Sequence, residues 1–235
     1  MFLRDCSDCG HIADVCEYAA GGISMQDIVV CGWYTPDYQP WADKLLSNLK
    51  SHGLPHDVVK IEQLTGSWEQ KTRAKADQVL KAMNRHHDKT IFFIDVDCEV
   101  RNPGKLLELK SRRCDVGFYI RTRFRRAGGV KWGVRSGTLL IQPTDKARAF
   151  VEAWRDLNAS APAYSHDQDT LMVAMGRVPG CAFSVLDLRY CATLGDGLKD
   201  PWILHSSASE NTPKASKWKK WKSQRRPRHA HDSDI

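Results

Sequence analysis

The sequence predicts a single α/β domain built on a mixed, mostly parallel sheet that is flanked by helices. Short apolar segments alternate with amphipathic segments of helical period, which is the order of strand and crossover helix in a parallel sheet. One of them, TIFFIDVDCEV at residues 90–100, begins with an apolar run that fits a strand covered on both faces. With 235 residues, of which 42% are hydrophobic, the chain is long enough for one sizeable core.

The first half of the chain predicts three strands separated by two helices. Trp41, Leu45 and Leu49 recur at helical spacing, and Gly53 ends that pattern. Ser67 is the expected N-cap of the second helix. The predicted elements are a strand at 27–33, a helix within 36–55, a strand at 56–62, a helix at 67–87 and the strand of the apolar run.

The second half predicts further strands and helices in the same domain. Strands are expected at 115–120, 136–143, 181–187 and 201–205, and helices at 144–158 and 167–175.

Flanking segments divide the chain into an N-terminal extension at 1–26, a domain at 27–210 and a basic tail at 211–235. The extension has no clear periodicity. Its metal-ligand types are Cys6, Cys9, His11 and Cys16. Cys6 and Cys9 are separated by two residues, as in a zinc knuckle, but no second pair of ligands follows. We therefore expect these cysteines to be free thiols. The other cysteines are expected to be reduced in a domain of this size.

The net charge of +7 lies almost entirely in the tail. From Lys214 onward, eight basic residues stand against two acidic ones, and Trp218 and Trp221 are interspersed among them. This composition suits nucleic acid, an anionic membrane surface or a solubilising tail. No apolar run has the length of a membrane span and the N-terminus lacks the order of a signal peptide, so we expect a cytoplasmic protein.

Two carboxylates, Asp95 and Asp97, follow the apolar strand directly. The carboxyl end of such a strand is where a ligand crevice opens. Residues two apart share a face on an extended chain, although a turn would redirect one of them. Like charges held close together repel unless a cation or protons intervene, so the pair indicates a metal.

The order of these elements, with SGTLLIQPT at 136–144, SHDQDTL at 165–171 and WILHSS at 202–207, resembles the GT-A glycosyltransferases over residues 27–207. The resemblance implies a Rossmann-like GT-A fold and transfer of a hexose from a nucleoside-diphosphate sugar, a UDP-sugar above all, to a hydroxyl. It also implies a divalent cation, Mn²⁺ or Mg²⁺, held against the diphosphate by the Asp-x-Asp motif. Such a hard cation would neutralise the charge that develops on the leaving group.

The resemblance also assigns roles to individual residues. Asp97 would be the main metal ligand and Asp95 would contact the ribose and the metal. His205 would be the third ligand, or else a histidine satisfied by the backbone at a strand end. Asp167 would bind the acceptor hydroxyl or act as its general base; the alternative is that Asp167 or Asp169 caps a helix. Ser136 and Gly137 would lie beneath the donor sugar.

Four further positions are candidates for donor binding. Lys71 and Lys75 are four residues apart and so share a helical face, which would meet the phosphates or simply face solvent. Tyr34, beside Trp33, would flank a nucleobase or belong to the core, and Thr35 would offer a hydrogen bond.

Two other functions remain open from the sequence. Phosphatases of the haloacid dehalogenase type also end an apolar strand with Asp-x-Asp, but on their first strand and with Thr or Val where this chain has Glu99. A non-catalytic nucleic-acid-binding protein would use the tail but leaves the acidic pair unexplained. For a glycosyltransferase, the acceptor would be a glycan, a lipid-linked sugar or a hydroxylated DNA base.

Overall fold

The computed structural model describes residues 27–124 and 129–206. The predicted extension at 1–26 and the tail at 211–235 lie outside the described residues, and so do their cysteines and tryptophans. In the part of the chain that is described, no helix has the length and apolar character needed to cross a membrane.

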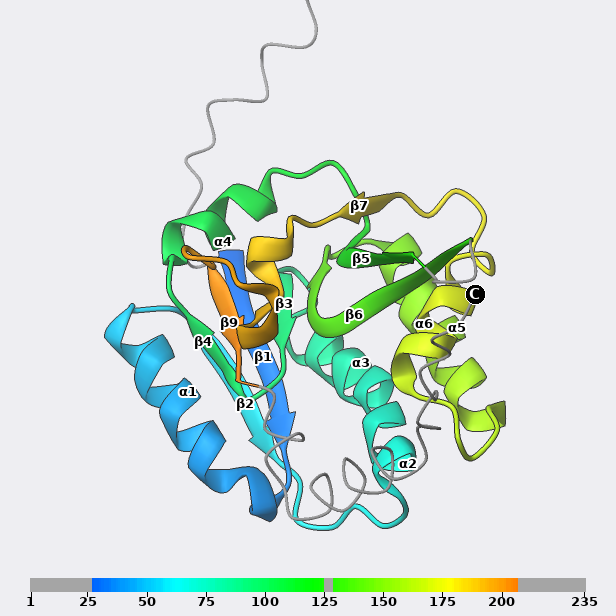
Figure 1. Ribbon diagram of the computed structural model, residues 1–235, viewed down its shortest axis with the longest axis horizontal. Coiled ribbons are helices and arrows are strands. Elements are labelled where there is room, and N and C mark those ends of the chain that lie inside the picture. Colours follow the sequence, from blue (N-terminus) through cyan, green and yellow to red (C-terminus); the bar gives the residue numbers. More distant parts are fainter. Residues whose placement is uncertain (1–26, 125–128, 207–235) are drawn as a thin grey trace, which may run out of the picture.

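Three parallel strands form one half of the central sheet. β1 (Ile28–Tyr34) lies between β2 (His56–Lys60) and β3 (Thr90–Ile94) and runs parallel to both. α1 (Gln39–Ser51) connects β1 to β2, while α2 (Trp68–Arg73) and α3 (Lys75–Arg85) connect β2 to β3. The carboxyl ends of β1 and β2 point to the edge of the sheet beside which α2 lies (Figure 1).

The other half of the sheet contains the strand that makes it mixed. β6 (Val130–Ile141) is antiparallel to β3 and to β5 (Val116–Phe124), and β5 is parallel to β7 (Phe183–Val185). The strand order is β2-β1-β3-β6-β5-β7. Within this sheet only β6 runs against the other strands, so the sheet is mixed and mostly parallel, as predicted.

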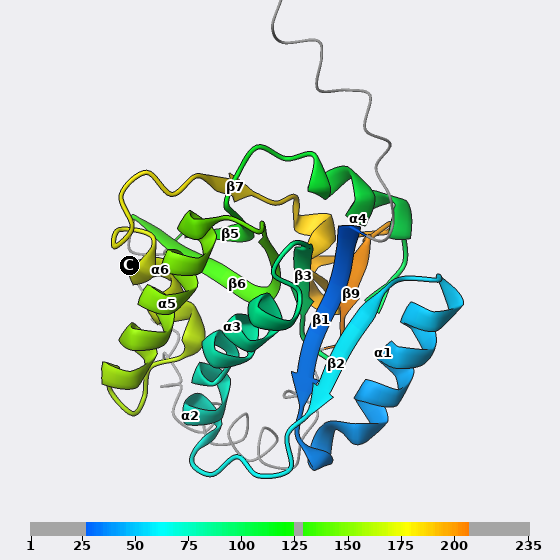
Figure 2. The ribbon, with the colours of Figure 1, turned by 180° about the vertical axis from the view of Figure 1, so that it is seen from behind.

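Helices cover both faces of this sheet because its strands are apolar on both sides. Val29 and Cys31 belong to the core cluster that contains residues of α3, α5 (Asp145–Ser160) and α6 (Asp167–Ala174). Ile28 and Val30, which point the other way, pack with α1 and α4 (Pro103–Lys110). Figures 1 and 2 show the sheet between these two groups of helices.

A small second sheet brings the end of the domain next to the acidic pair. Its strands β4 (Cys98–Val100), β9 (Ile203–His205) and β8 (Ala192–Thr193) are ordered β4-β9-β8. β4 and β9 are antiparallel, and Cys98 is the register partner of His205. Short 3-10 helices at Pro36–Tyr38, Leu188–Tyr190 and Leu194–Asp196 complete the described elements.

The predicted helix at 67–87 is wrong in one respect, because it is two helices with a break at Ala74. Ser67 is the N-cap, and its hydroxyl and backbone N–H bond reciprocally with Gln70. At the break, the carbonyl of Arg73 accepts a bond from Nδ2 of Asn158 at 2.9 Å, so α5 holds the chain there.

Other boundaries also differ from the predictions. β6 starts six residues before the predicted strand at 136–143, and β7 is shorter than the predicted strand at 181–187. Neither α4 nor the strands β4 and β8 were among the predicted elements.

Candidate active site

The two carboxylates after β3 point to different partners because the chain turns between them. The N–H of Asp95 donates to the carbonyl of Gly137 at 2.9 Å, which extends the β3–β6 ladder by one residue. The N–H of Cys98 then donates back to the carbonyl of Asp95 at 3.2 Å, which closes a turn. The Asp95 carboxylate consequently meets Lys75, whereas the Asp97 carboxylate lies with Cys98 and His205.

Lys75 is a buried ammonium group that joins three segments of the site. Its Nζ lies 2.8 Å from Oδ1 of Asp95 and 3.2 Å from Oδ2 of Asp167, and it donates to Ser136. Burial alone lowers the pKa of Lys75, but the carboxylates of Asp167 and Asp95 outweigh it and raise that pKa above its ordinary value. A permanent positive charge on α3 therefore holds the end of β3 to the start of α6.

Asp167 occupies the first turn of α6 but turns inward instead of capping it. Its side chain is buried, and Oδ2 accepts a bond of 2.5 Å from the Ser136 hydroxyl. Asp169 takes the capping role, since its carboxylate accepts from the N–H of His166 at 3.2 Å. Of the two carboxylates in the first turn of this helix, Asp167 is the one that faces the site.

His205 is buried among side chains, and its hydrogen bonds indicate its tautomer. The Thr138 hydroxyl donates to the carbonyl of Tyr190 at 2.8 Å, so its oxygen accepts from Nε2–H of His205 at 3.0 Å. Nδ1 then carries the lone pair and lies 3.2 Å from Sγ of Cys98. Ligand atoms of Asp97, Cys98 and His205 lie within 4.8 Å of one another.

Gly137 provides the space that this arrangement needs. A Cβ at position 137 would lie 2.5 Å from Cε1 of His205 and 3.0 Å from Oδ2 of Asp95. The segment predicted to lie beneath a donor sugar thus also supports two predicted metal ligands.

Six of the ten predicted site residues line one pocket with a volume of about 310 Å³. They are Tyr34, Thr35, Lys71, Lys75, Asp95 and Asp97. The remaining four lie next to this set: Ser136 and Asp167 bond to Lys75, Gly137 accepts from the N–H of Asp95, and a ligand atom of His205 lies within 4.8 Å of one of Asp97. The structure therefore brings all ten positions to one place at the carboxyl ends of β1 and β3.

The sequence prediction missed other residues of the pocket. Tyr38 and Trp68 line it, and Asp37 accepts a hydrogen bond from the Thr35 hydroxyl. Burial, followed by the carboxylates of Asp37, Asp97 and Asp95, raises the pKa of Tyr38. Trp68 is half exposed directly after the N-cap Ser67, and an aromatic residue on the first turn of a helix was the available signal.

Lys71 and Lys75 share the pocket although they do not share a helix. Lys71 is on α2 and Lys75 is on α3, on either side of the break at Ala74. The four-residue spacing predicted their common orientation from one continuous helix, so their convergence has a different structural origin.

Comparison with known proteins gives matches in structure but not in sequence. No protein-family model matches the chain, and no curated protein matches it. A glycosyltransferase involved in the glycosylation of the major capsid of PBCV-1 is similar over 83% of this chain and 98% of its own, with a TM-score of 0.59 and 16% identity.

The apo form of the glycosyltransferase GlyE of Streptococcus pneumoniae TIGR4 has a TM-score of 0.51 and 12% identity over 83% of this chain. The match spans 63% of the length of GlyE. Both neighbours are glycosyltransferases of the GT-A type, and they share the six-stranded mixed sheet flanked by helices. The chain therefore has the GT-A fold of glycosyltransferases.

Proposed function

We propose that this protein is a metal-dependent glycosyltransferase that moves a hexose from a UDP-sugar to a hydroxyl acceptor. The observation that carries the proposal is the convergence of the acidic pair, His205, Lys75 and Asp167 around one pocket at the carboxyl ends of β1 and β3. This is the edge of an α/β sheet at which ligands bind. The glycosyltransferase neighbours support transfer of a sugar, and they do not favour the phosphatase or the nucleic-acid-binding alternative.

Asp97, Asp95 and His205 are the residues that would hold the divalent cation. The donor set fits Mn²⁺, because it combines carboxylate oxygens with an imidazole nitrogen whose lone pair is not engaged by Thr138. Nε2–H of His205 bonds to Thr138, and such an outer hydrogen bond orients a ligating histidine. The cation would supply positive charge to the diphosphate leaving group.

The rest of the pocket suits the nucleotide portion of the donor. Tyr34, Tyr38 and Trp68 offer aromatic surface to a nucleobase, and Thr35 offers a hydroxyl. Lys71 offers a cation for the phosphates and is partly exposed at the pocket wall. Lys75, whose ammonium group already bonds to Asp95, Asp167 and Ser136, would position those side chains for the donor.

Asp167 is the candidate for handling the acceptor. Its carboxylate is fixed by the Ser136 hydroxyl and by Lys75, so its position relative to Asp95 is set before any ligand binds. In the proposed reaction it would bind the acceptor hydroxyl or remove its proton. The basic tail would serve the acceptor or a charged surface, as the sequence predicts.

A thermal-shift screen tests this function. UDP-, GDP-, CDP- and dTDP-sugars are added with and without Mn²⁺, and release of the nucleoside diphosphate is followed in parallel. A ligand that binds only the folded state raises the melting temperature by mass action. We expect UDP-sugars to raise it in the presence of Mn²⁺ and to be hydrolysed slowly. The proposal is wrong if no nucleotide sugar shifts the melting temperature with Mn²⁺ present.

A further inference from the structure

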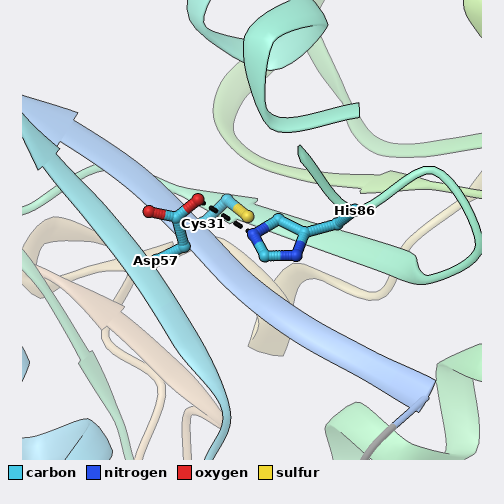
Figure 3. Close-up of side chains that lie close together, drawn as sticks. All are labelled: Cys31, Asp57 and His86. Carbon is cyan, nitrogen blue, oxygen red and sulfur yellow. Dashed lines mark hydrogen bonds and ion pairs between the residues drawn. The ribbon is translucent and has the colours of Figure 1, made fainter. Parts of the chain in front are cut away.

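A second group of metal-ligating side chains lies outside the donor pocket. Cys31 on β1 and Asp57 on β2 are register partners, and His86 lies at the C-terminal end of α3. Their ligand atoms lie within 4.8 Å of one another. Figure 3 shows the three side chains pointing toward a common point, two of them from strands and His86 from the segment that follows α3.

The carboxylate of Asp57 is the centre of this group. Its Oδ2 lies 2.9 Å from Nε2 of His86 and 2.7 Å from Nε of Arg85. An ion pair explains these two bonds, and the thiol of Cys31, which packs in the core, lies within 4.8 Å of the same groups. That thiol is 1% exposed, whereas the side chains of Asp57 and His86 are each 23% exposed. The group is therefore anchored in the core and open to solvent on one side.

We propose that Cys31, Asp57 and His86 form a zinc site that fastens the end of α3 to the edge of the sheet. A thiolate, a carboxylate and an imidazole are all ligands that Zn²⁺ takes, and water would complete a tetrahedral set. Binding replaces the bond between His86 and Asp57, so the Nε2 proton of His86 passes through solvent to Nδ1, and the thiol proton of Cys31 is released to solvent. Arg85, whose side chain is 42% exposed, either keeps its ion pair with Oδ2 of Asp57 or turns into the solvent.

Both groups contain a cysteine, an aspartate and a histidine, and the donor pocket differs by a second carboxylate, that of Asp95. A soft thiolate with an imidazole favours Zn²⁺, whereas a site rich in carboxylate oxygen favours Mn²⁺ or Mg²⁺. Burial, with a further contribution from Asp57, raises the pKa of the Cys31 thiol to about 12. The thiol therefore stays protonated without an ion and is not a reactive nucleophile.

Cobalt provides the probe for the test, because a thiolate bound to Co²⁺ absorbs in the near ultraviolet. The full chain is freed of metal with a chelator and titrated with Co²⁺, and Zn²⁺ is then added to displace it. We expect the thiolate band in the wild type and in Cys98→Ser, and its loss in Cys31→Ser. Because Cys98 lies with Asp97 and His205, this pair of variants separates the two groups of ligands.

Histidine variants test the site without substituting the buried Cys31. His86→Ala removes a partly exposed ligand and is expected to weaken Co²⁺ and Zn²⁺ binding ~10-fold or more. The adjacent exposed residue gives the matched control, His87→Ala, which should bind as the wild type does. Circular dichroism checks that each variant folds.

Three results would overturn the zinc site. One is a wild-type chain that shows no thiolate band and no rise in melting temperature with Zn²⁺. Another is a band that persists in Cys31→Ser and disappears in Cys98→Ser. The third is equal metal affinity in His86→Ala and His87→Ala. The first and third results do not bear on Mn²⁺-dependent donor binding, and the second would place the bound metal beside Asp97 and His205. The zinc site and the proposed glycosyltransferase function can therefore fail independently.

Discussion

Gly137 lies against the imidazole of His205, and a Cβ at position 137 would come within 2.5 Å of Cε1 of that ring. The same Cβ would lie 3.0 Å from Oδ2 of Asp95. Neither neighbour can move aside easily, because His205 is buried and Asp95 is bonded to Lys75. A glycine is thus required here by the close approach of two proposed metal ligands.

Gly137→Ala should consequently displace His205 and weaken Mn²⁺-dependent nucleotide binding ~10-fold or more. Overpacking should also cost about 1–3 kcal/mol in the free energy of unfolding. Calorimetry with UDP and Mn²⁺ measures the first effect, and urea unfolding measures the second. Gly133→Ala on the same strand is the control, because a Cβ there meets nothing within 4 Å. Equal donor affinity in the two variants would contradict the role given to His205.

Removing the charge of Lys75 should destabilise the fold. Lys75→Met leaves the buried carboxylate of Asp167 without its cation and is expected to cost about 3–5 kcal/mol in urea unfolding. Adding Asp167→Asn to this variant should recover part of that loss, since the uncompensated charge is then gone.

Lys71 is the matched comparison for Lys75. Lys71→Met should leave the free energy of unfolding within about 0.5 kcal/mol, because the residue is partly exposed on α2. It should nevertheless weaken UDP binding through the loss of a phosphate contact. A Lys75→Met protein as stable as Lys71→Met would show that Lys75 does not hold the site together.

Arg135 and Asp196 should make stability depend on pH. Their two bonds, of 2.6 and 2.8 Å, hold the pKa of the Asp196 carboxyl well below its usual range, and Thr193 adds further bonds. The folded-state pKa is lowered, so the contribution is full above the ordinary pKa of about 3.9 and is lost as pH falls toward the folded value.

Asp196→Asn should therefore lower the free energy of unfolding at neutral pH, and its difference from the wild type should shrink on acidification. Urea unfolding across the pH range measures this dependence. Asp200→Asn is the control, because its side chain is 74% exposed and it lies 3.5 Å from Arg189. An unchanged difference between wild type and Asp196→Asn from neutral pH to pH about 2 would contradict the linkage.

The sequence predicted those parts of the fold that carry a periodic signal. The apolar run before Asp95 marks a strand buried on both faces, and the spacing of Leu45 and Leu49 marks α1. No glycine or proline marks the break at Ala74 in the sequence. The break coincides with the bond from Asn158 in α5, which is distant in sequence and could not be predicted. β4 and β8 are too short to show a period, so two of the three strands of the second sheet were missed, while β9 lies within the predicted strand at 201–205.

The candidate site was predicted residue by residue, but its internal contacts were not. Helical spacing placed Lys75 in the site and the resemblance placed Asp167 there, each separately, whereas their ion pair joins α3 to α6 across many residues of sequence. Cys98 was expected only to be a reduced cysteine, and its pairing with His205 across β4 and β9 is what places it beside a proposed ligand. Contacts of this kind arise from topology, which local patterns do not encode.

Calorimetry of UDP binding by Asp97→Asn, with and without Mn²⁺, tests the central claim most directly. The substitution is nearly isosteric and removes one negative charge from the proposed metal ligands. Glu99→Gln is the control, since Glu99 is an exposed carboxylate two residues away that pairs with Arg101. We predict that Mn²⁺ strengthens UDP binding in the wild type and in Glu99→Gln but not in Asp97→Asn, with the melting temperature of the apoprotein retained. Mn²⁺-dependent UDP affinity equal to the wild type in Asp97→Asn would contradict the account.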